Sequence, residues 1–304
     1  MKSVARHAPT ADRVILAMDD AARRDMEGDE GILVIGPGEI MDLEELQRMR
    51  RRYTPAEICF ASKPRLLRAM LQAGYKKAHY LDSDMFVTAS PSPIDAALEA
   101  AAILLVPHWT NAYEGEAGVE ELDLLRAGTF NAGYVGVSAD SEAVRFLNWW
   151  TQRCERWGYN DTSLGLCGDQ RWLDPVPYLF NRVSTARRPQ FNAGYWNLGG
   201  GTLEARGAEI FLNGEPLIVL HLSGFDPRRP DQLTRYFHRI DDSRLLILTQ
   251  LLQQYTNEWN AVLPSIPPRR LFAGWRRVGK VATLPVRFAR SLLRRWDIHA
   301  ARRH

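Results

Sequence analysis

The 304-residue sequence contains only three cysteines and has no long apolar run. Cys59, Cys154 and Cys167 include no Cys-x-x-Cys pair, so neither a disulfide framework nor a zinc cluster is expected, and we predict three buried, reduced thiols. No stretch approaches the roughly 18 apolar residues that a membrane-spanning helix needs, which argues against an integral membrane protein. No apolar run follows the basic residues of the N-terminus, so we expect no signal peptide and a cytoplasmic protein.

Charge is distributed unevenly along the chain. The net charge is +3, but residues 265–304 hold eleven Lys and Arg residues against one acid, which leaves −7 on residues 1–264. Phe288, Leu292 and Trp296 recur at helical spacing opposite the arginines, as in a basic amphipathic helix at an anionic membrane surface, here the inner face of the membrane. A helix docked on its own domain fits the pattern as well. No nucleic-acid recognition motif accompanies the tail, so we expect no nucleic-acid partner.

Short apolar runs alternate with amphipathic helical patterns, which predicts an α/β fold. Prolines that follow residue 263 predict a boundary, so we expect one domain over residues 1–264 and a basic helical appendage over residues 265–304. The expected strands are Arg13–Met18, Gly31–Ile35, His79–Leu81, Ile103–Val106, Tyr134–Val137 and Leu217–Leu220. The expected helices are Asp42–Tyr53, Lys63–Ala73 with Pro64 in its first turn, Ser141–Trp157 and Ser243–Glu258.

Two carboxylates follow one of these apolar strands. Asp82 and Asp84 come directly after His79–Leu81, and ligands of open α/β sheets bind at the ends of strands. Carboxylates there suit Mg²⁺ or Mn²⁺ shared with phosphate oxygens. A turn with two solvated acids is one alternative. A haloacid-dehalogenase phosphatase is another, although that family usually has Thr or Val where this chain has Phe86, and opens its domain with the motif.

Four further motifs occur in a fixed order around this segment. They are the helix start at Lys63-Pro64, then Phe130-Asn131-Ala132-Gly133, Gly168-Asp169-Gln170 and His221-Leu222-Ser223-Gly224. With Leu81-Asp82-Ser83-Asp84 the set resembles the family-8 type of GT-A glycosyltransferases over about residues 10–240. The resemblance implies a GT-A fold, a divalent metal (Mn²⁺ or Mg²⁺), and retaining transfer of a sugar from a nucleotide-sugar donor, such as a UDP-sugar, to a glycan, lipid or protein acceptor.

The resemblance also implies a role for each matching residue. Three of these roles have a plain structural alternative: Lys63 could be a surface helix lysine, His221 a hydrogen-bonded core residue, and Asp169 a helix cap. Gly224 would let the backbone approach a diphosphate closely. The implied metal ligands are Asp82, Asp84 and His221, the implied donor contacts are Lys63, Asn131 and Gly224, and the residues beside the reacting sugar carbon are Asp169 and Gln170.

Tryptophans supply a further candidate for sugar binding. Trp196 lies in a loop-like stretch and could stack on a sugar, whereas Trp149 and Trp150 are adjacent on a predicted helix, so at least one of them should point into the core.

The sequence departs from the family pattern in two places. The basic residues after the His-x-x-Gly motif are Arg228 and Arg229 where the family commonly has a lysine, and the strand that in related chains carries nucleotide contacts ahead of residue 7 is absent from the sequence. A non-catalytic relative that binds a glycan or a partner therefore stays an alternative to an enzyme.

Overall fold

The computed structural model describes residues 1–26, 31–111, 119–236 and 241–262, and Met1–Ala261 form one compact unit. The predicted basic tail lies outside the described residues. None of the described helices is long and apolar enough to cross a membrane. The helices are α1 (Lys2–His7), α2 (Asp20–Met26), α3 (Leu43–Arg52), α4 (Pro55–Gln72), α5 (Ser92–Glu99), α6 (Val119–Ala127), α7 (Ser141–Trp157), α8 (Val176–Leu179) and α9 (Asp242–Val262), with short 3-10 turns η1 (Pro37–Glu39), η2 (Thr162–Leu164), η3 (Gln170–Leu173), η4 (Pro189–Phe191) and η5 (Leu198–Gly200).

The strands confirm the predicted α/β class, since each predicted strand overlaps an observed one. They are β1 (Arg13–Leu16), β2 (Ile32–Ile35), β3 (Lys77–Leu81), β4 (Met85–Val87), β5 (Ile103–Pro107), β6 (Phe130–Ser138), β7 (Asn160–Asp161), β8 (Leu166–Cys167), β9 (Val183–Thr185), β10 (Leu203–Arg206), β11 (Glu209–Leu212), β12 (Glu215–Pro216) and β13 (Val219–His221).

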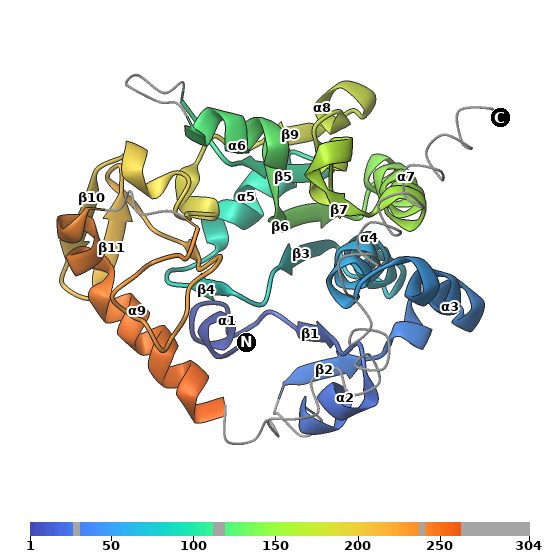
Figure 1. Cartoon of the computed structure of the whole chain (residues 1–304), viewed down its shortest axis with the longest axis horizontal. Helices are drawn as coiled ribbons and strands as arrows, with labels where there is room; N and C mark the ends of the chain where they lie inside the picture. Colours follow the sequence, from blue (N-terminus) through green and yellow to red (C-terminus); the bar gives the residue numbers. More distant parts are fainter. Residues whose placement is uncertain (27–30, 112–118, 237–240, 263–304) are drawn as a thin grey trace. The chain divides into compact units, whose positions relative to one another are not determined.

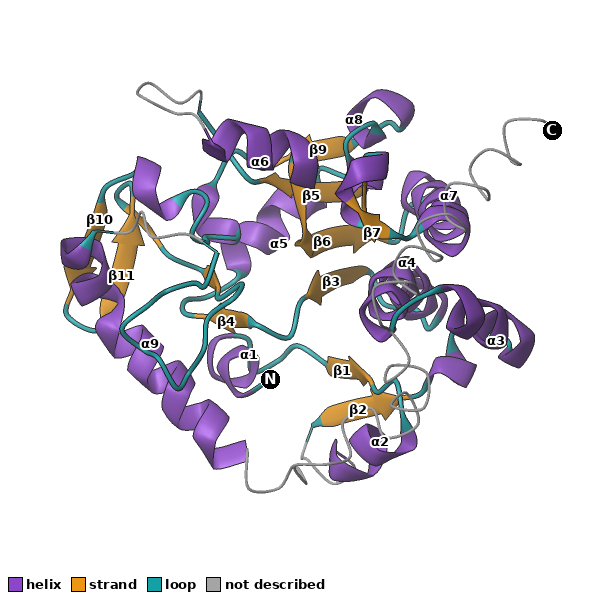
Figure 2. Cartoon of the chain, in the orientation of Figure 1, coloured by secondary structure: helices purple, strands orange, loops and turns teal. Residues whose placement is uncertain are grey.

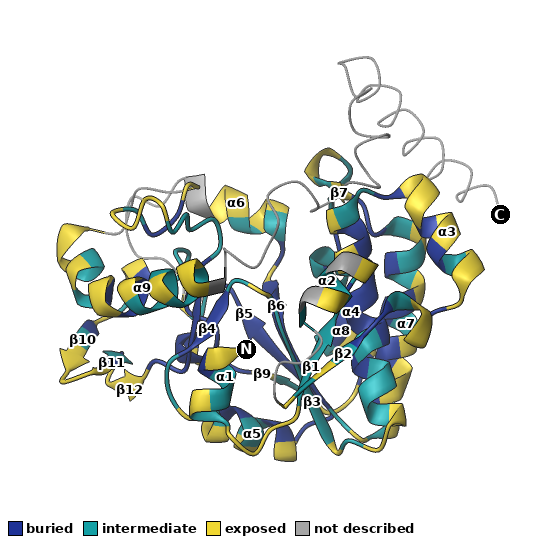
Figure 3. Cartoon of the chain, turned by 90° about the horizontal axis from the view of Figure 1, so that it is seen from below, coloured by how far each residue is buried: buried dark blue, intermediate teal, exposed yellow. Residues whose placement is uncertain are grey.

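A mixed four-stranded sheet forms the centre of the unit, in the order β3-β6-β5-β9 (Figures 1 and 2). Strand β6 runs antiparallel to β3 and β5, whereas β9 runs parallel to β5. Successive residues of a strand point to opposite faces of the sheet. Leu104 and Leu105 of β5 are both fully buried, so both faces of the sheet are covered at this strand (Figure 3). The long apolar run of β5 follows from this two-sided burial.

Two of the four smaller sheets in the described residues bear on the site. Strand β13 pairs antiparallel with β4, and β1 pairs parallel with β2 (Figure 1). A cavity of about 680 Å³ is lined by Arg13 and Val14 of β1 and by Lys77 to Leu81 of β3. Within the described residues, β1 pairs only with β2 and β3 only with β6.

Helix α4 begins earlier than predicted, and Pro64 lies inside it instead of in its first turn. The sequence prediction was wrong because it overlooked a capping box: the amide of Glu57 donates to the Thr54 hydroxyl, and the Glu57 carboxylate accepts from the Thr54 amide at 2.7 Å. Pro55 then occupies the first helical position, where its missing N–H costs nothing. Lys63 consequently sits in the middle of a helix that packs against α7 and β3.

The thiol prediction holds for Cys154, which is fully buried, and is wrong for Cys59, which is exposed. Cys167 is of intermediate exposure. Ile58 and Ala61, close to Cys59 on α4, are buried, because a helix buries only the stripe of side chains that meets its neighbours.

Candidate metal and donor site

Strand pairing brings the Asp-x-Asp segment beside the Asn131–Gly133 segment. The amide of Asp82 donates to the carbonyl of Gly133 at 2.9 Å, which extends the pairing of β3 with β6 by one residue. A turn follows at once, since the amide of Met85 donates to the carbonyl of Asp82 at 3.0 Å. The site therefore begins where the sheet ends.

Strand β4 then places Asp84 next to His221. Met85 pairs with His221 in the β4–β13 ladder, and the amide of Leu222 donates to the carbonyl of Asp84 at 2.9 Å. Nε2 of His221 lies 3.3 Å from Oδ1 of Asp84. Residues more than 130 positions apart in the sequence thus meet through one short pair of strands.

Asp82, Asp84 and His221 form a cluster that fits a divalent cation. Each offers one ligand atom, and the three atoms lie within 4.8 Å of one another. His221 is 5% exposed, whereas the side chain of Asp84 is 41% exposed, so the cluster is anchored in protein and accessible from outside. Carboxylate oxygens suit Mg²⁺ and Mn²⁺, and the imidazole nitrogen favours Mn²⁺ of the two.

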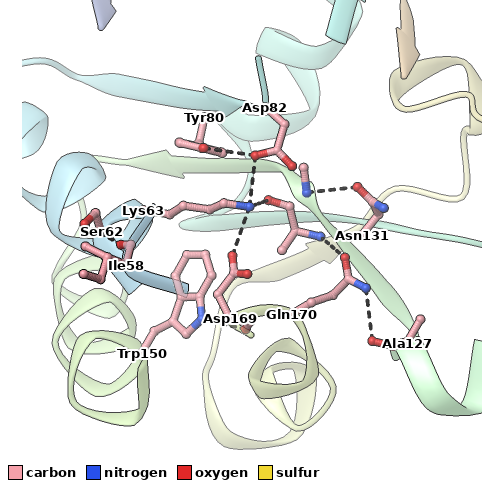
Figure 4. Close-up of polar contacts among 12 residues, drawn as sticks. Ile58, Ser62, Lys63, Tyr80, Asp82, Ala127, Asn131, Trp150, Asp169 and Gln170 are labelled. Carbon is pink, nitrogen blue, oxygen red and sulfur yellow. Dashed lines mark hydrogen bonds and ion pairs between the residues drawn. The ribbon is translucent and has the colours of Figure 1, made fainter. Parts of the chain in front are cut away.

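Lys63 lies behind this cluster, between two carboxylates (Figure 4). Its Nζ is 3.0 Å from Oδ1 of Asp82 and 3.1 Å from Oδ2 of Asp169, and it donates to the carbonyl of Ala132 at 3.0 Å. Its positive charge therefore faces two carboxylate oxygens and one backbone carbonyl oxygen, all within 3.1 Å. With a side chain only 3% exposed, Lys63 is not the surface lysine that the sequence left open.

Burial and the two carboxylates set the charges in this cluster. Burial raises the pKa of Asp169 to about 6, although Lys63 lowers it. Burial lowers the pKa of Lys63, but Asp169 and Asp82 outweigh it and hold that pKa well above its ordinary value. Burial also raises the pKa of Tyr80, whose hydroxyl stays protonated and donates to Asp82 at 3.0 Å. Near neutral pH the buried lysine is charged, and Asp82 is held by two donors.

Asp169 and Gln170 are anchored through the core. The Asp169 side chain makes no capping bond to η3, so the helix-cap alternative does not apply. The indole of Trp150 donates to the carbonyl of Asp169 at 3.0 Å (Figure 4). The carboxamide of Gln170 accepts from the amide of Ala132 at 3.0 Å and donates to the carbonyl of Ala127 at 3.1 Å. Gln170 thereby ties this segment to β6.

Asn131 and Trp196 lie against the histidines of the site. Oδ1 of Asn131 accepts from the Gly133 amide at 2.9 Å, and its Nδ2 contacts Nε2 of His108 at 3.1 Å. The ring of Trp196 packs edge-on against His108 and His221, with centroids 5.3 and 5.1 Å apart. Trp196 therefore forms a wall of the site, while Trp150 is in the core, as predicted for one of the adjacent pair.

A polar cavity of about 460 Å³ begins at Gly224, three residues after His221. Gly224 has φ +74°, and a β-carbon there would lie 2.6 Å from the Tyr236 ring, so both backbone conformation and space require glycine. Arg228 pairs with Asp226 at 2.8 Å. The other lining residues that matter for charge and stacking are Arg229, Arg235, Tyr255 and Trp259.

Comparison with known proteins places the chain in a family. No family model matches it. The uncharacterized protein YfnF of Bacillus subtilis (strain 168) is 30% identical over 223 residues, which are 69% of this chain and 71% of YfnF. The chain belongs to the YfnF family. The uncharacterized protein YfnD of the same organism is 25% identical over 235 residues, which are 74% of this chain and 73% of YfnD.

Two solved structures are also similar to this YfnF-family chain. The galactosyltransferase LgtC, solved with donor and acceptor sugar analogues, matches 86% of this chain and 93% of its own, with 17% identity and a TM-score of 0.42. The glycosyltransferase GlyE of Streptococcus pneumoniae TIGR4 matches 88% of this chain and 60% of its own, with 16% identity and a TM-score of 0.40.

Four residues at the site of this YfnF-family chain escaped the sequence analysis as functional candidates: Tyr80, His108, Gly133 and Asn192. His108 and Asn192 act through contacts with residues distant in the sequence, for which no local pattern exists, whereas Tyr80 contacts Asp82 two positions away. Gly133 could have been recognised from the sequence, because a glycine inside a buried strand often marks the close approach of another group. A β-carbon on Gly133 would lie against Cε1 of His221 and 2.6 Å from Oδ1 of Asn131.

Replacing Gly133 by alanine is therefore expected to displace His221 and weaken Mn²⁺ binding by about 10–100-fold, the range seen when the support of a metal ligand is lost. Strand β6 is paired on both edges, so the backbone cannot move away to make room. Titration calorimetry with MnCl₂ measures the effect. Gly199→Ala is the matched control, since no atom lies within 4 Å of the added methyl group. Equal affinities for the two variants would contradict this view of Gly133.

Proposed function

We propose that this chain is a metal-dependent GT-A glycosyltransferase that moves a sugar from a nucleotide diphosphate sugar, with a UDP-sugar as the first candidate, to a hydroxyl acceptor with retention. The observation that carries the proposal is the convergence of Asp82, Asp84 and His221, whose ligand atoms lie within 4.8 Å of one another. The ordered motifs that suggested this chemistry contribute Lys63 and Asp169 to the same place.

In this proposal some side chains hold the cation, and Lys63 orients the carboxylates around it. Asp82, Asp84 and His221 would hold the cation, which when bound supplies positive charge against the departing diphosphate. Lys63 is buried between the carboxylates of Asp82 and Asp169 and donates to the carbonyl of Ala132, so we assign it a positioning role. The acceptor oxygen would form the new bond to the anomeric carbon, the diphosphate would leave with the electrons of the bond that breaks, and the hydroxyl proton would pass to an oxygen of the departing diphosphate.

The cavity at Gly224 supports a place for the diphosphate. Its arginines supply positive charge, and the amide of a residue with positive φ can face an anion. Arg229 is a closer substitute for the family lysine than Arg228, whose guanidinium already pairs with Asp226.

Calorimetry with UDP, in the presence and absence of Mn²⁺, tests the proposal on the full chain. We expect UDP to bind with Mn²⁺ and much more weakly without it, with ADP and GDP as controls for the base. A screen of UDP-sugars for Mn²⁺-dependent release of UDP then identifies the donor. Absence of UDP binding under both conditions would contradict the proposal and favour a non-catalytic protein that binds a glycan or a partner.

A further inference from the structure

A chain of buried hydrogen bonds runs away from the carboxylate cluster into the core. Nδ1 of His221 lies 3.0 Å from Oδ1 of Asn192, Nδ2 of Asn192 donates to Oδ1 of Asn131 at 3.0 Å, and Nδ2 of Asn131 contacts Nε2 of His108 at 3.1 Å. Asn192 is fully buried, and the other three are between 5% and 7% exposed. Solvent therefore does not compete for these bonds.

Strand pairing fixes the position of Asn192 in this chain. The amide of His221 donates to the carbonyl of Ala193 at 2.6 Å, and the amide of Ala193 donates to the carbonyl of Val219 at 2.9 Å. The residue before Ala193 is thereby held alongside β13 and faces the imidazole ring. Its side chain is therefore held in hydrogen-bonding distance of His221 and Asn131.

The direction of every bond in the chain follows from one backbone amide. The N–H of Gly133 can only donate, so the atom of Asn131 that it meets at 2.9 Å is the oxygen. That oxygen also receives the bond from Asn192, which must therefore point its NH₂ group toward Asn131. The oxygen of Asn192 is left facing Nδ1 of His221, and this ring nitrogen must carry a proton.

The other ring nitrogen then decides whether a cation can bind. Oδ1 of Asp84 lies 3.3 Å from Nε2 and would accept a proton from it. A neutral imidazole with its proton on Nε2 has no lone pair there for a metal. Asn192 opposes this state, because with the proton on Nε2 the lone pair of Nδ1 would face the oxygen of Asn192.

We propose that Asn192 is the positioning residue of the metal site, and that it holds a proton on Nδ1 of His221 so that Nε2 is presented to the cation beside Asp84. The proposal rests on the proposed metal site for its consequence, but the proton on Nδ1 is a property of the metal-free protein. Hydrogen-bond partners on the far nitrogen of a ligating histidine have this effect in other metal sites.

Long-range proton–nitrogen correlation spectra of ¹⁵N-histidine-labelled full-length protein test it directly. The chain has seven histidines, and His221→Gln identifies the resonances of residue 221. At about pH 8 we expect the Nδ1 shift of a protonated nitrogen in the wild type, with or without Mg²⁺. In Asn192→Ala we expect the proton to move to Nε2, and Mn²⁺ affinity measured by calorimetry to fall by about 10–100-fold.

Two variants separate this role from general loosening of the loop. Asn192→Asp keeps a hydrogen-bond acceptor beside Nδ1 of His221, so this nitrogen is expected to keep its proton. Asn197→Ala removes a side chain that bonds the backbone of the same loop, at Gly194 and Asn192, and is expected to leave His221 unchanged.

A deprotonated Nδ1 in the wild type would overturn the proposal, as would wild-type spectra and Mn²⁺ affinity in Asn192→Ala. If Asn192→Ala fails to fold, the spectrum of the wild type alone still tests the proposal. A protonated Nδ1 in a wild type that binds no Mn²⁺ would count against the metal site and support the assignment of the proton.

Discussion

The Asp84→Asn variant is expected to lose Mn²⁺ binding and, with it, Mn²⁺-dependent UDP binding. An amide keeps the shape of the side chain but removes the negative charge that a divalent cation requires. Calorimetry with MnCl₂, followed by UDP, measures both. Because this side chain is 41% exposed, we expect the free energy of unfolding to change by no more than about 1 kcal/mol.

Asp123→Asn is the matched control for this result. Asp123 pairs with Arg126 on the surface of α6 at 3.1 Å and is not part of the Asp82–Asp84–His221 cluster, so the same change of charge occurs outside the proposed metal ligands. We expect wild-type Mn²⁺ and UDP affinity in this variant. Wild-type affinity in Asp84→Asn as well would show that the cation is not held by this cluster.

Replacing Lys63 by methionine is expected to lower the free energy of unfolding by about 3–5 kcal/mol at neutral pH, because it leaves the Asp169 carboxylate buried without its cation. Urea denaturation followed by circular dichroism measures the loss. Adding Asp169→Asn to this variant removes the unpaired charge and is expected to restore part of the lost stability. Lys77→Met, which breaks an exposed pair with Glu99, should cost less than about 1 kcal/mol.

The cost of Lys63→Met should also depend on pH. The pKa of Asp169 is about 6 in the folded chain against an ordinary value of 3.8, so the folded state binds this proton more tightly, and the contribution to stability is lost as the pH rises through about 6. Lys63 lowers that pKa, and its removal lets the carboxyl become neutral at higher pH. The difference in stability between wild type and variant should therefore be larger at about pH 8 than at about pH 5. A difference that does not change with pH would contradict the role of Asp169.

The sequence predicted those parts of the fold and site that leave a local pattern. The apolar run of β5 and the helical spacing of α7 are local, and both elements appear where they were predicted. Asp82 and Asp84 were recognisable because a strand end and two carboxylates are adjacent in sequence. The start of α4 also has a local signal, the capping box at Thr54. Pro64, ten residues later, fits the first turn of a helix as well, and the prediction placed the start there.

The rest of the site depends on strand register, which the sequence does not reveal. Asn192 contacts Asn131 from 61 residues away, and Asn131 contacts His108 from 23 residues away. These bonds form only because β6, β13 and the segment before Ala193 are aligned to within one residue, and a shift by one would turn each side chain to the opposite face.

The buried side chain of Trp150 has two separate structural roles. Its ring stacks on Phe146 with centroids 5.3 Å apart in the core, while its indole N–H holds the carbonyl of Asp169. For protein engineering this means that core packing and the anchoring of the Asp169 segment depend on different atoms of the same residue. A screen that selects on melting temperature alone could accept phenylalanine at position 150, since the aromatic packing is largely kept, and would pass a protein in which the segment carrying the buried carboxylate has lost its anchor.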